Sequence, residues 1–335
     1  MMSNLLDIQA LSLGFRTEKG IAKVLDRIDI SVKPGEIVGL VGESGCGKST
    51  LARAILGTLP EGQTEINSGH IRLDGVDMLS GGKAAEHLRG RVVTFVPQDP
   101  FASFNPLFRI GTQIQDLMRF KAPRDGAGSF GRSRKADEAS AIAMLDAVQL
   151  PQPKAILAKY PHQLSGGQRQ RVMIAMALLP QPRMIIADEP TTALDVTVQA
   201  QILGLLRRLA VERGVSVLFT THDLGAAWEI CDRIVVMYAG QTAEIAPREQ
   251  FFGDPRHPYT RMLLDSLPSP GRDPVGIPGG VPSPLKAPDG CRFNPRCPRA
   301  TDICHESRPA LTTGSDGHAV ACHHPWLAKA ESAHV

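Results

Sequence analysis

The sequence predicts an α/β fold with a largely parallel sheet, a helical insertion and a small cysteine-rich extension at the C-terminal end. Three observations support this prediction: short β-branched runs alternate with helical stretches, strand character is lost after residue 99, and four cysteines crowd the last 45 residues. At 335 residues the chain exceeds the usual size of one domain. We therefore expect a first domain at residues 1–255, with a helical subdomain at about 99–170, and an extension at 256–335.

The buried strands are predicted from short, nearly continuous apolar runs, which are typical of a parallel sheet covered on both faces. Between two of these runs, Ile202, Leu205, Leu206 and Leu209 repeat at helical spacing, as in a crossover helix. The expected strands are residues 37–41, 92–96, 184–187, 215–220 and 234–238.

The C-terminal extension begins with a change of composition. Seven prolines occur between Pro268 and Pro288, too many for a helix or a central strand. We expect an extended, proline-stiffened linker that leads to the cysteines.

Composition and charge are those of an ordinary globular protein. Hydrophobic residues make up 42% and charged residues 21%, and the net charge is +3. No long run of Lys or Arg is present, so nucleic acid is not expected as a partner.

The longest apolar run, residues 172–179, is shorter than the roughly 18 to 20 residues that cross a bilayer. The first ten residues do not have the pattern of a signal peptide. We expect a cytosolic chain whose membrane role, if it has one, is supplied by a partner.

A phosphate-binding loop is predicted directly after the strand at 37–41. Residues 42–49 read Gly-Glu-Ser-Gly-Cys-Gly-Lys-Ser and match the pattern G-x-x-x-x-G-K-[ST]. In such a loop backbone N–H groups surround the phosphates, Lys48 reaches the β- and γ-phosphates, and Ser49 ligates magnesium. A glycine-rich turn with a surface lysine is the alternative, which the flanking strand and helix disfavour. The expected ATP-binding residues are Gly42, Ser44, Gly45, Cys46, Gly47, Lys48, Ser49 and Thr50, with Cys46 in a packing role.

Two carboxylates end the apolar run at 184–187. Asp188 is expected at the carboxyl edge of the sheet, where it can hold magnesium, and Glu189 can polarise an attacking water. One carboxylate would suffice for the metal, so the second favours ATP hydrolysis. A purely structural role is the weaker alternative, because two adjacent acids repel one another without a cation.

Residues 164–168, Leu-Ser-Gly-Gly-Gln, resemble the signature of the ABC ATPases, and they lie between the phosphate loop and the acidic strand as in that family. The resemblance implies a P-loop NTPase of the ABC type. It also implies that ATP is bound between two subunits, with Ser165, Gly166, Gly167 and Gln168 directed at the γ-phosphate held by the other subunit. Ser165 is a good helix N-cap, and glycines permit close approach to phosphate.

Further residues match the other motifs of this family. Gln98 resembles the Q-loop glutamine, which also contacts magnesium, and residues 192–195 resemble the D-loop that ends at Asp195. His222 resembles the switch histidine. Phe15 is expected to stack on adenine, although a core Phe is nearly as common. With these assignments the catalytic set is Glu189, His222 and Gln98, and the magnesium set is Ser49, Gln98 and Asp188.

Segments without a generic catalytic role narrow the resemblance to the peptide, opine and nickel importers. They are residues 97–100 (Pro-Gln-Asp-Pro), 104–106 (Phe-Asn-Pro), 257–260 (His-Pro-Tyr-Thr) and 291–298 (Cys-Arg-Phe-Asn-Pro-Arg-Cys-Pro). This branch implies peptide import energised by a paralogous ATPase subunit, two permeases and an extracytoplasmic substrate-binding protein, at the cytoplasmic face of the inner membrane. The alternative is a soluble ABC ATPase of DNA repair or translation, which usually carries two cassettes or a coiled-coil insert.

A contact with the permease is expected near residues 101–107. Phe101, Phe104 and Leu107 fall at i, i+3 and i+6 and could form one apolar patch on a short helix. Core packing of the three residues is nearly as probable an interpretation.

The four C-terminal cysteines are expected to bind a [4Fe-4S] cluster. Five, six and seventeen residues separate Cys291, Cys297, Cys304 and Cys322, and such a cluster takes four thiolates. The resembled importer ATPases have a matching cysteine tail. Zinc is the alternative, disfavoured by the lack of close Cys-x2-Cys pairs, and disulfides are disfavoured in a reducing cytosol. The tail lies outside every ATPase motif, so replacing a cysteine is expected to leave the phosphate site intact.

Overall fold

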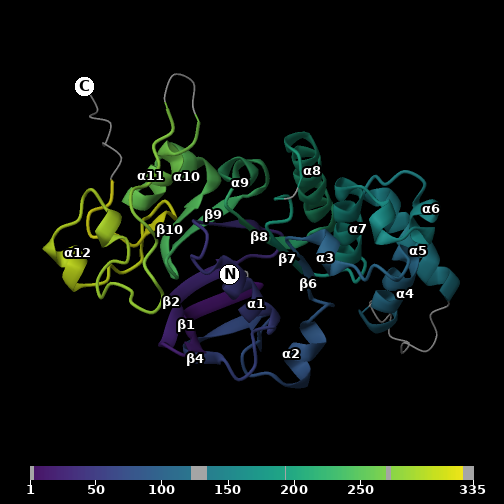
Figure 1. Ribbon diagram of the computed structural model, residues 1–335, viewed down its shortest axis with the longest axis horizontal. Helices are drawn as coiled ribbons and strands as arrows, with labels where there is room; N and C mark the ends of the chain where they lie inside the picture. The colour runs from purple at the N-terminus through teal and green to yellow at the C-terminus, as the bar shows by residue number, and fades with distance from the viewer. Residues whose placement is uncertain (1–3, 122–133, 193, 269–272, 327–335) are drawn as a thin grey trace. The chain divides into compact units, whose positions relative to one another are not determined.

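The computed structural model describes residues 4–121, 134–192, 194–268 and 273–326 (Figure 1). Contacts divide the chain into two compact units. Unit 1 contains residues 32–37 and 80–220, and unit 2 contains residues 4–31, 38–79 and the described part of 221–335.

Unit 1 is built on three parallel strands in the order β8-β7-β6. β6 (Val93–Val96), β7 (Met184–Asp188) and β8 (Ser216–Thr221) agree with the predicted strands to within one residue at each end. The predicted crossover helix is α8 (Val196–Arg213), which connects β7 to β8 and buries all four residues of the predicted apolar repeat. These parallel strands bring Asp188 level with Thr220 at the carboxyl edge.

The insertion in unit 1 is helical, and its helices pack on one another (Figure 1). In α4 the buried Ile110, Ile114 and Met118 repeat every four residues and form its apolar stripe. Besides α8, the helices of this unit are α2 (Gly82–Leu88), α3 (Pro100–Ser103), α4 (Ile110–Lys121), α5 (Arg134–Ala147), α6 (Pro153–Ala158), η1 (Pro161–Gln163) and α7 (Gly166–Leu178).

The expected apolar patch around α3 is wrong in one of its three residues. The helix ends at Ser103, and Phe104 is its C-terminal cap with only 5% of its surface exposed. Phe101 and Leu107 are 56% and 79% exposed. Phe104 therefore belongs to the core, and its neighbours do not share a helical face with it.

Unit 2 contains an antiparallel sheet that the sequence analysis did not predict. Its strand order is β2-β1-β4-β5, formed by β1 (Leu6–Thr17), β2 (Gly20–Val32), β4 (Thr64–Leu73) and β5 (Val76–Asp77). Inward-facing Leu6, Ile8, Leu11 and Leu13 of β1 are buried, with more exposed residues between them. Such half-buried strands lack the continuous apolar run that marks a parallel strand.

A second sheet of unit 2 combines the strand before the phosphate loop with strands from the C-terminal part of the chain. β3 (Ile37–Val41) pairs in parallel with β9 (Arg233–Tyr238), and β10 (Gln241–Pro247) continues the sheet antiparallel to β9. The extension adds β12 (Ala319–Val320) beside β10 and β11 (Thr312–Thr313) beside β12. The helices of unit 2 are α1 (Lys48–Leu56), α9 (Leu224–Ile230), α10 (Arg248–Gly253), α11 (Pro258–Asp265), η2 (Asn294–Arg296) and α12 (Asp302–Glu306).

Among the described residues, no helix combines the length and the apolarity that a membrane span requires.

Candidate functional site

The phosphate loop, residues 42–49, connects β3 to α1 in unit 2. Gly42 and Gly47 have φ angles of 149° and 108°, which disfavour residues with a side chain. A Cβ atom at Gly42 would also collide with the carbonyl of Met237. Gly47 is the N-cap of α1 and supplies no side-chain acceptor. The start of an α-helix is a site at which backbone N–H groups can bind an anion.

Lys48 is folded back over this loop. Its Nζ atom donates to the carbonyl oxygens of Gly42 at 2.7 Å and Glu43 at 3.4 Å, and the residue is buried. Cys46 is fully buried, and burial raises the pKa of its thiol. The packing interpretation of Cys46 therefore fits the structure, and its side chain is not available to a nucleotide. Ser44 and Gly45 are exposed, and Ser49 and Thr50 are half-buried.

Asp188 and Glu189 share one hydroxyl group at the end of β7. Thr220 Oγ1 donates to Asp188 Oδ1 at 2.5 Å and accepts from the Glu189 amide at 3.1 Å. Glu189 has a φ of 45°, the left-handed conformation that disfavours residues with a side chain, so the chain turns sharply where the strand ends. Asp188 is buried and Glu189 is half-buried.

The Glu189 carboxylate is oriented by two donors from unit 1. Gln98 Nε2 and Thr192 Oγ1 both donate to Glu189 Oε2, each at 3.2 Å. The structure thus brings Gln98 and Glu189 together, two residues predicted separately from motifs 91 positions apart. A carboxylate held by two side chains keeps one orientation, as a water-activating group requires.

The signature segment, residues 165–168, begins α7 with a reciprocal capping box. Ser165 Oγ accepts from the Gln168 amide at 3.2 Å, and Gln168 Oε1 accepts from the Ser165 amide at 3.1 Å. A Cβ atom at Gly167 would lie 2.8 Å from Val198 Cγ1 of α8. Asp195 caps α8 by accepting from Val198 N at 3.0 Å. The signature segment and the end of the D-loop are therefore neighbours; Ala193, inside that loop, lies outside the described residues.

His222 and Phe15 belong to unit 2. His222 follows β8 directly and is exposed, next to Asp223, which caps α9 by accepting from two amides. Phe15 is half-buried near the end of β1, opposite Thr64 of β4. Unit 2 also contains the phosphate loop, whereas Gln98, the signature segment and the two carboxylates belong to unit 1.

The four C-terminal cysteines line one pocket in unit 2, together with His257, Phe293 and other residues of the extension. Burial raises the pKa of Cys291 and Cys297, and that of Cys322 to about 11. These thiols therefore stay protonated near neutral pH unless a bound group takes them as thiolates. Within the described ranges, no three His, Cys, Asp or Glu side chains converge closely enough to hold a metal ion.

The extension lies outside the ATPase motifs in the sequence, but it contacts one of them in the fold. Arg296, between the first two cysteines of the extension, forms an ion pair with Glu43 of the phosphate loop at 2.7 Å. Tyr259 Oη accepts from the Glu43 amide at 2.9 Å. Sequence reasoning missed both residues, although Tyr259 and Arg296 lie in the two C-terminal stretches that it singled out.

Comparison with known proteins identifies the family. The family model described as ABC transporter matches residues 25–192. The dipeptide transport ATP-binding protein DppD of Escherichia coli (strain K12) is 43% identical over 325 residues, which cover 96% of this chain and 97% of that protein. The chain belongs to the ABC transporter family. This agrees with the resemblance found in the motifs.

This ABC family member also matches a family model in its C-terminal part, a second relative over nearly its whole length, and a solved ATP-binding cassette. The model for the C-terminal region of oligopeptide/dipeptide transporters matches residues 243–304. The oligopeptide transport ATP-binding protein OppD of Haemophilus influenzae is 41% identical and covers 97% of this chain and 98% of its own length. A solved ATP-binding cassette, dimeric and bound to ADP and Pi, aligns with a TM-score of 0.62 at 29% identity, over 72% of this chain and 98% of its own.

Proposed function

We propose that this protein hydrolyses ATP to energise the import of dipeptides or oligopeptides through partner permease subunits. One observation carries the proposal. Relatives named as dipeptide and oligopeptide transport ATP-binding proteins are 41% to 43% identical over nearly the whole chain. The similarity includes the extension, which matches the C-terminal region of those transporters.

The residues of the phosphate loop bind the nucleotide in this proposal. Lys48 contacts the β- and γ-phosphates in place of the loop carbonyls that it contacts now, and the amides at the start of α1 bind phosphate oxygens. Ser49, Gln98 and Asp188 offer the oxygen ligands that magnesium prefers, and magnesium offsets phosphate charge when bound. Phe15 stacks on adenine.

Glu189 orients and deprotonates the attacking water. Support comes from its two donors, Gln98 and Thr192, and from its backbone, which Thr220 fixes. His222 contacts the γ-phosphate of the bound ATP. One carboxylate would suffice for magnesium, so the second one, Glu189 beside Asp188, favours hydrolysis over phosphoryl transfer.

The signature segment and Asp195 act on nucleotide held by a second ATPase subunit, a paralogue of this chain. Ser165 is exposed while its capping box is satisfied within its own helix, so it can face a partner without loss of local structure. Two permeases and an extracytoplasmic substrate-binding protein complete the transporter, and this subunit lies peripherally at the cytoplasmic face of the inner membrane. The exposed Phe101 and Leu107 contact the permease.

The proposal includes a [4Fe-4S] cluster held by Cys291, Cys297, Cys304 and Cys322. All four line one pocket, and a cluster of this type takes four cysteine thiolates. Zinc is the alternative, and the lack of close Cys-x2-Cys pairs disfavours it. When bound, the cluster cross-links segments of the extension. Protein purified without oxygen is expected to be brown and to contain iron and acid-labile sulfide. Colourless protein with one zinc per chain would contradict the cluster.

Glu189→Gln tests the hydrolytic function. The variant is expected to bind ATP normally, because Lys48 and Asp188 remain, and to hydrolyse it about 100-fold more slowly or worse, because the base is lost. Turnover and ATP affinity are measured on the subunit assembled with its partners. Thr192→Val, which removes only one donor to the carboxylate, serves as the milder control. Turnover of Glu189→Gln at the original rate would exclude the assignment.

A further inference from the structure

Arg296 is held rigidly at the edge of the phosphate loop. Its guanidinium has five N–H donors, and each has an acceptor within unit 2. Two donors reach the Glu43 carboxylate, at 2.7 and 3.1 Å, in the bidentate geometry of strong arginine–carboxylate pairs. The other three reach Pro278 O, Ile277 O and Tyr238 Oη. Only 3% of the side chain is exposed, and the hydrogen bond to Glu43 raises the pKa of Arg296.

Glu43 is held from two sides by C-terminal residues. Besides the Arg296 ion pair, its backbone amide donates to Tyr259 Oη at 2.9 Å. The Tyr259 ring is fully buried and packs on Tyr238 and Phe293, at centroid distances of 4.6 and 5.3 Å. These contacts fix the direction of both the side chain and the amide of Glu43, which is the second residue of the phosphate loop. The amides that follow in the loop depend on that direction.

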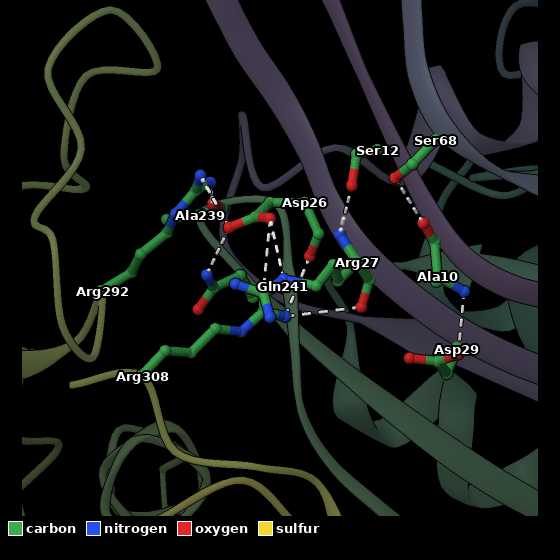
Figure 2. A network of polar contacts seen from close by, with 10 residues as sticks. All are labelled: Ala10, Ser12, Asp26, Arg27, Asp29, Ser68, Ala239, Gln241, Arg292 and Arg308. Carbon is green, nitrogen blue, oxygen red and sulfur yellow. Dashed lines mark hydrogen bonds and ion pairs between the residues drawn. The ribbon is translucent and has the colours of Figure 1, made fainter.

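The segment from Cys291 to Cys297 is anchored to the rest of unit 2 at both ends. Arg292, next to Cys291, donates to Ala239 O and pairs with Asp26 of β2 at 3.2 Å, as Figure 2 shows. Burial would raise the pKa of Asp26, but a hydrogen bond from Gln241 and the nearby arginines outweigh it and hold the pKa below its ordinary value. At the other end of the segment, Arg296 precedes Cys297 and reaches the phosphate loop. Any contact that fixes the backbone at Cys297 therefore also fixes the backbone at Arg296, the residue before it.

We infer that Arg296 is a positioning residue for the phosphate loop. It acts through Glu43, and it links ATP binding to the order of the Cys291–Cys297 segment. The inference rests on the proposed role of residues 42–49 in binding ATP. The coupling free energy between two linked sites is the same in both directions. If an ordered Cys291–Cys297 segment strengthens ATP binding, ATP binding must therefore stabilise the ordered segment by the same free energy.

The affinity arm of the test is a double-mutant cycle on the full-length chain, read by trinitrophenyl-ATP binding. Arg296→Gln and Glu43→Gln are each expected to weaken ATP binding about tenfold, or about 1.4 kcal/mol. The double variant is expected to be no weaker than either single variant, because both remove the same contact. Arg296→Lys is expected to recover little, since an ammonium cannot reproduce the bidentate pair.

Arg256→Gln is the matched control. Arg256 also pairs with two carboxylates in the C-terminal part of unit 2, those of Asp254 and Asp316. Its replacement is expected to leave ATP affinity within about twofold of the original, since these partners lie outside the phosphate loop. If Arg296→Gln does not fold, Glu43→Gln carries the test, because the Glu43 side chain is 29% exposed.

The reciprocal arm measures hydrogen exchange of the amides of residues 291–297 with and without Mg-ATP. ATP is expected to slow exchange several-fold in the original protein and not in Arg296→Gln. Unchanged ATP affinity in folded Arg296→Gln, or full additivity in the cycle, would overturn the inference. Lys48→Ala tests the proposed ATP-binding role of residues 42–49 separately, because Arg296 is intact in this variant. Normal ATP affinity in Lys48→Ala would overturn that role.

Discussion

The phosphate loop and the signature segment are both glycine-rich turns that open a helix, yet they are held in different ways. The phosphate loop contacts distant parts of unit 2: the Met237 carbonyl faces Gly42, and Tyr259 and Arg296 hold Glu43. The signature segment has its capping box between Ser165 and Gln168, three residues apart. One turn depends on the complete fold, and the other is stabilised largely by its own sequence.

This difference suits the two proposed tasks. A loop that binds phosphates of its own nucleotide gains from a fixed backbone, because the amides then need no reorganisation on binding. A segment that meets the nucleotide of another subunit must leave its outer face open, so its support has to come from within its helix. The capping box between Ser165 and Gln168 and the exposure of Ser165 fit that requirement.

The largest expected effect in this comparison comes from Ser165. Ser165→Ala is expected to lower hydrolysis about 100-fold in the assembled ATPase pair, the loss typical of one transition-state donor. ATP binding by the isolated chain should not change, because the phosphate loop is untouched. The lost N-cap also costs about 1 kcal/mol of stability. The measurements are the rate of ATP hydrolysis by the assembled pair, the ATP affinity of the isolated chain, and its free energy of unfolding in urea.

Ser165→Asp separates capping from catalysis. Aspartate keeps an acceptor for the Gln168 amide and should preserve stability, but its charge repels the γ-phosphate, so hydrolysis should stay low. Hydrolysis at the original rate in Ser165→Asp would break the comparison, because the segment would then have only a structural role.

A smaller effect is expected from pH, through His257 in unit 2. Burial lowers the pKa of His257 from 6.5 to about 4, so the ring is neutral in the fold, and its Nδ1 accepts from Tyr259 N at 3.0 Å. Between these pH values the unfolded chain binds a proton that the folded protein does not. The stabilisation is therefore complete above about pH 6.5 and is lost as pH falls towards 4. At pH 5 the loss is about 2 kcal/mol.

His257→Asn supplies the control for this prediction. Asparagine offers an acceptor for the cap of α11 but does not titrate. Urea unfolding at pH 7 and pH 5 is expected to show a smaller difference for the variant than for the original protein. Equal differences in the two proteins would contradict the role of His257.

Much of the parallel sheet could be predicted because its strands are short, nearly continuous apolar runs. Residues 37–41 and 184–187 each form such a run, and each is directly followed by a motif. The helix cap at Ser165 was also readable, since both members of the capping box lie within four residues. Local patterns sufficed where the stabilising contacts are local.

The contacts that could not be predicted join distant parts of the chain. Nothing in periodicity indicates that Arg296 meets Glu43, or that β12 pairs with β10 through two residues. The antiparallel strands β1, β2 and β4 expose part of each face and lack a continuous apolar run. Phe104 was misassigned because spacing alone does not show where a helix ends.

The pairing of Glu43 with Arg296 also has a consequence for the order of events during synthesis. The two residues are 253 positions apart. At about 5 to 20 residues per second, the ribosome needs roughly 10 to 50 seconds to make Arg296 after Glu43. During that interval the loop lacks its guanidinium anchor. By the inference above, a chain that stops before residue 296 is expected to bind ATP about tenfold more weakly than one that contains Arg296.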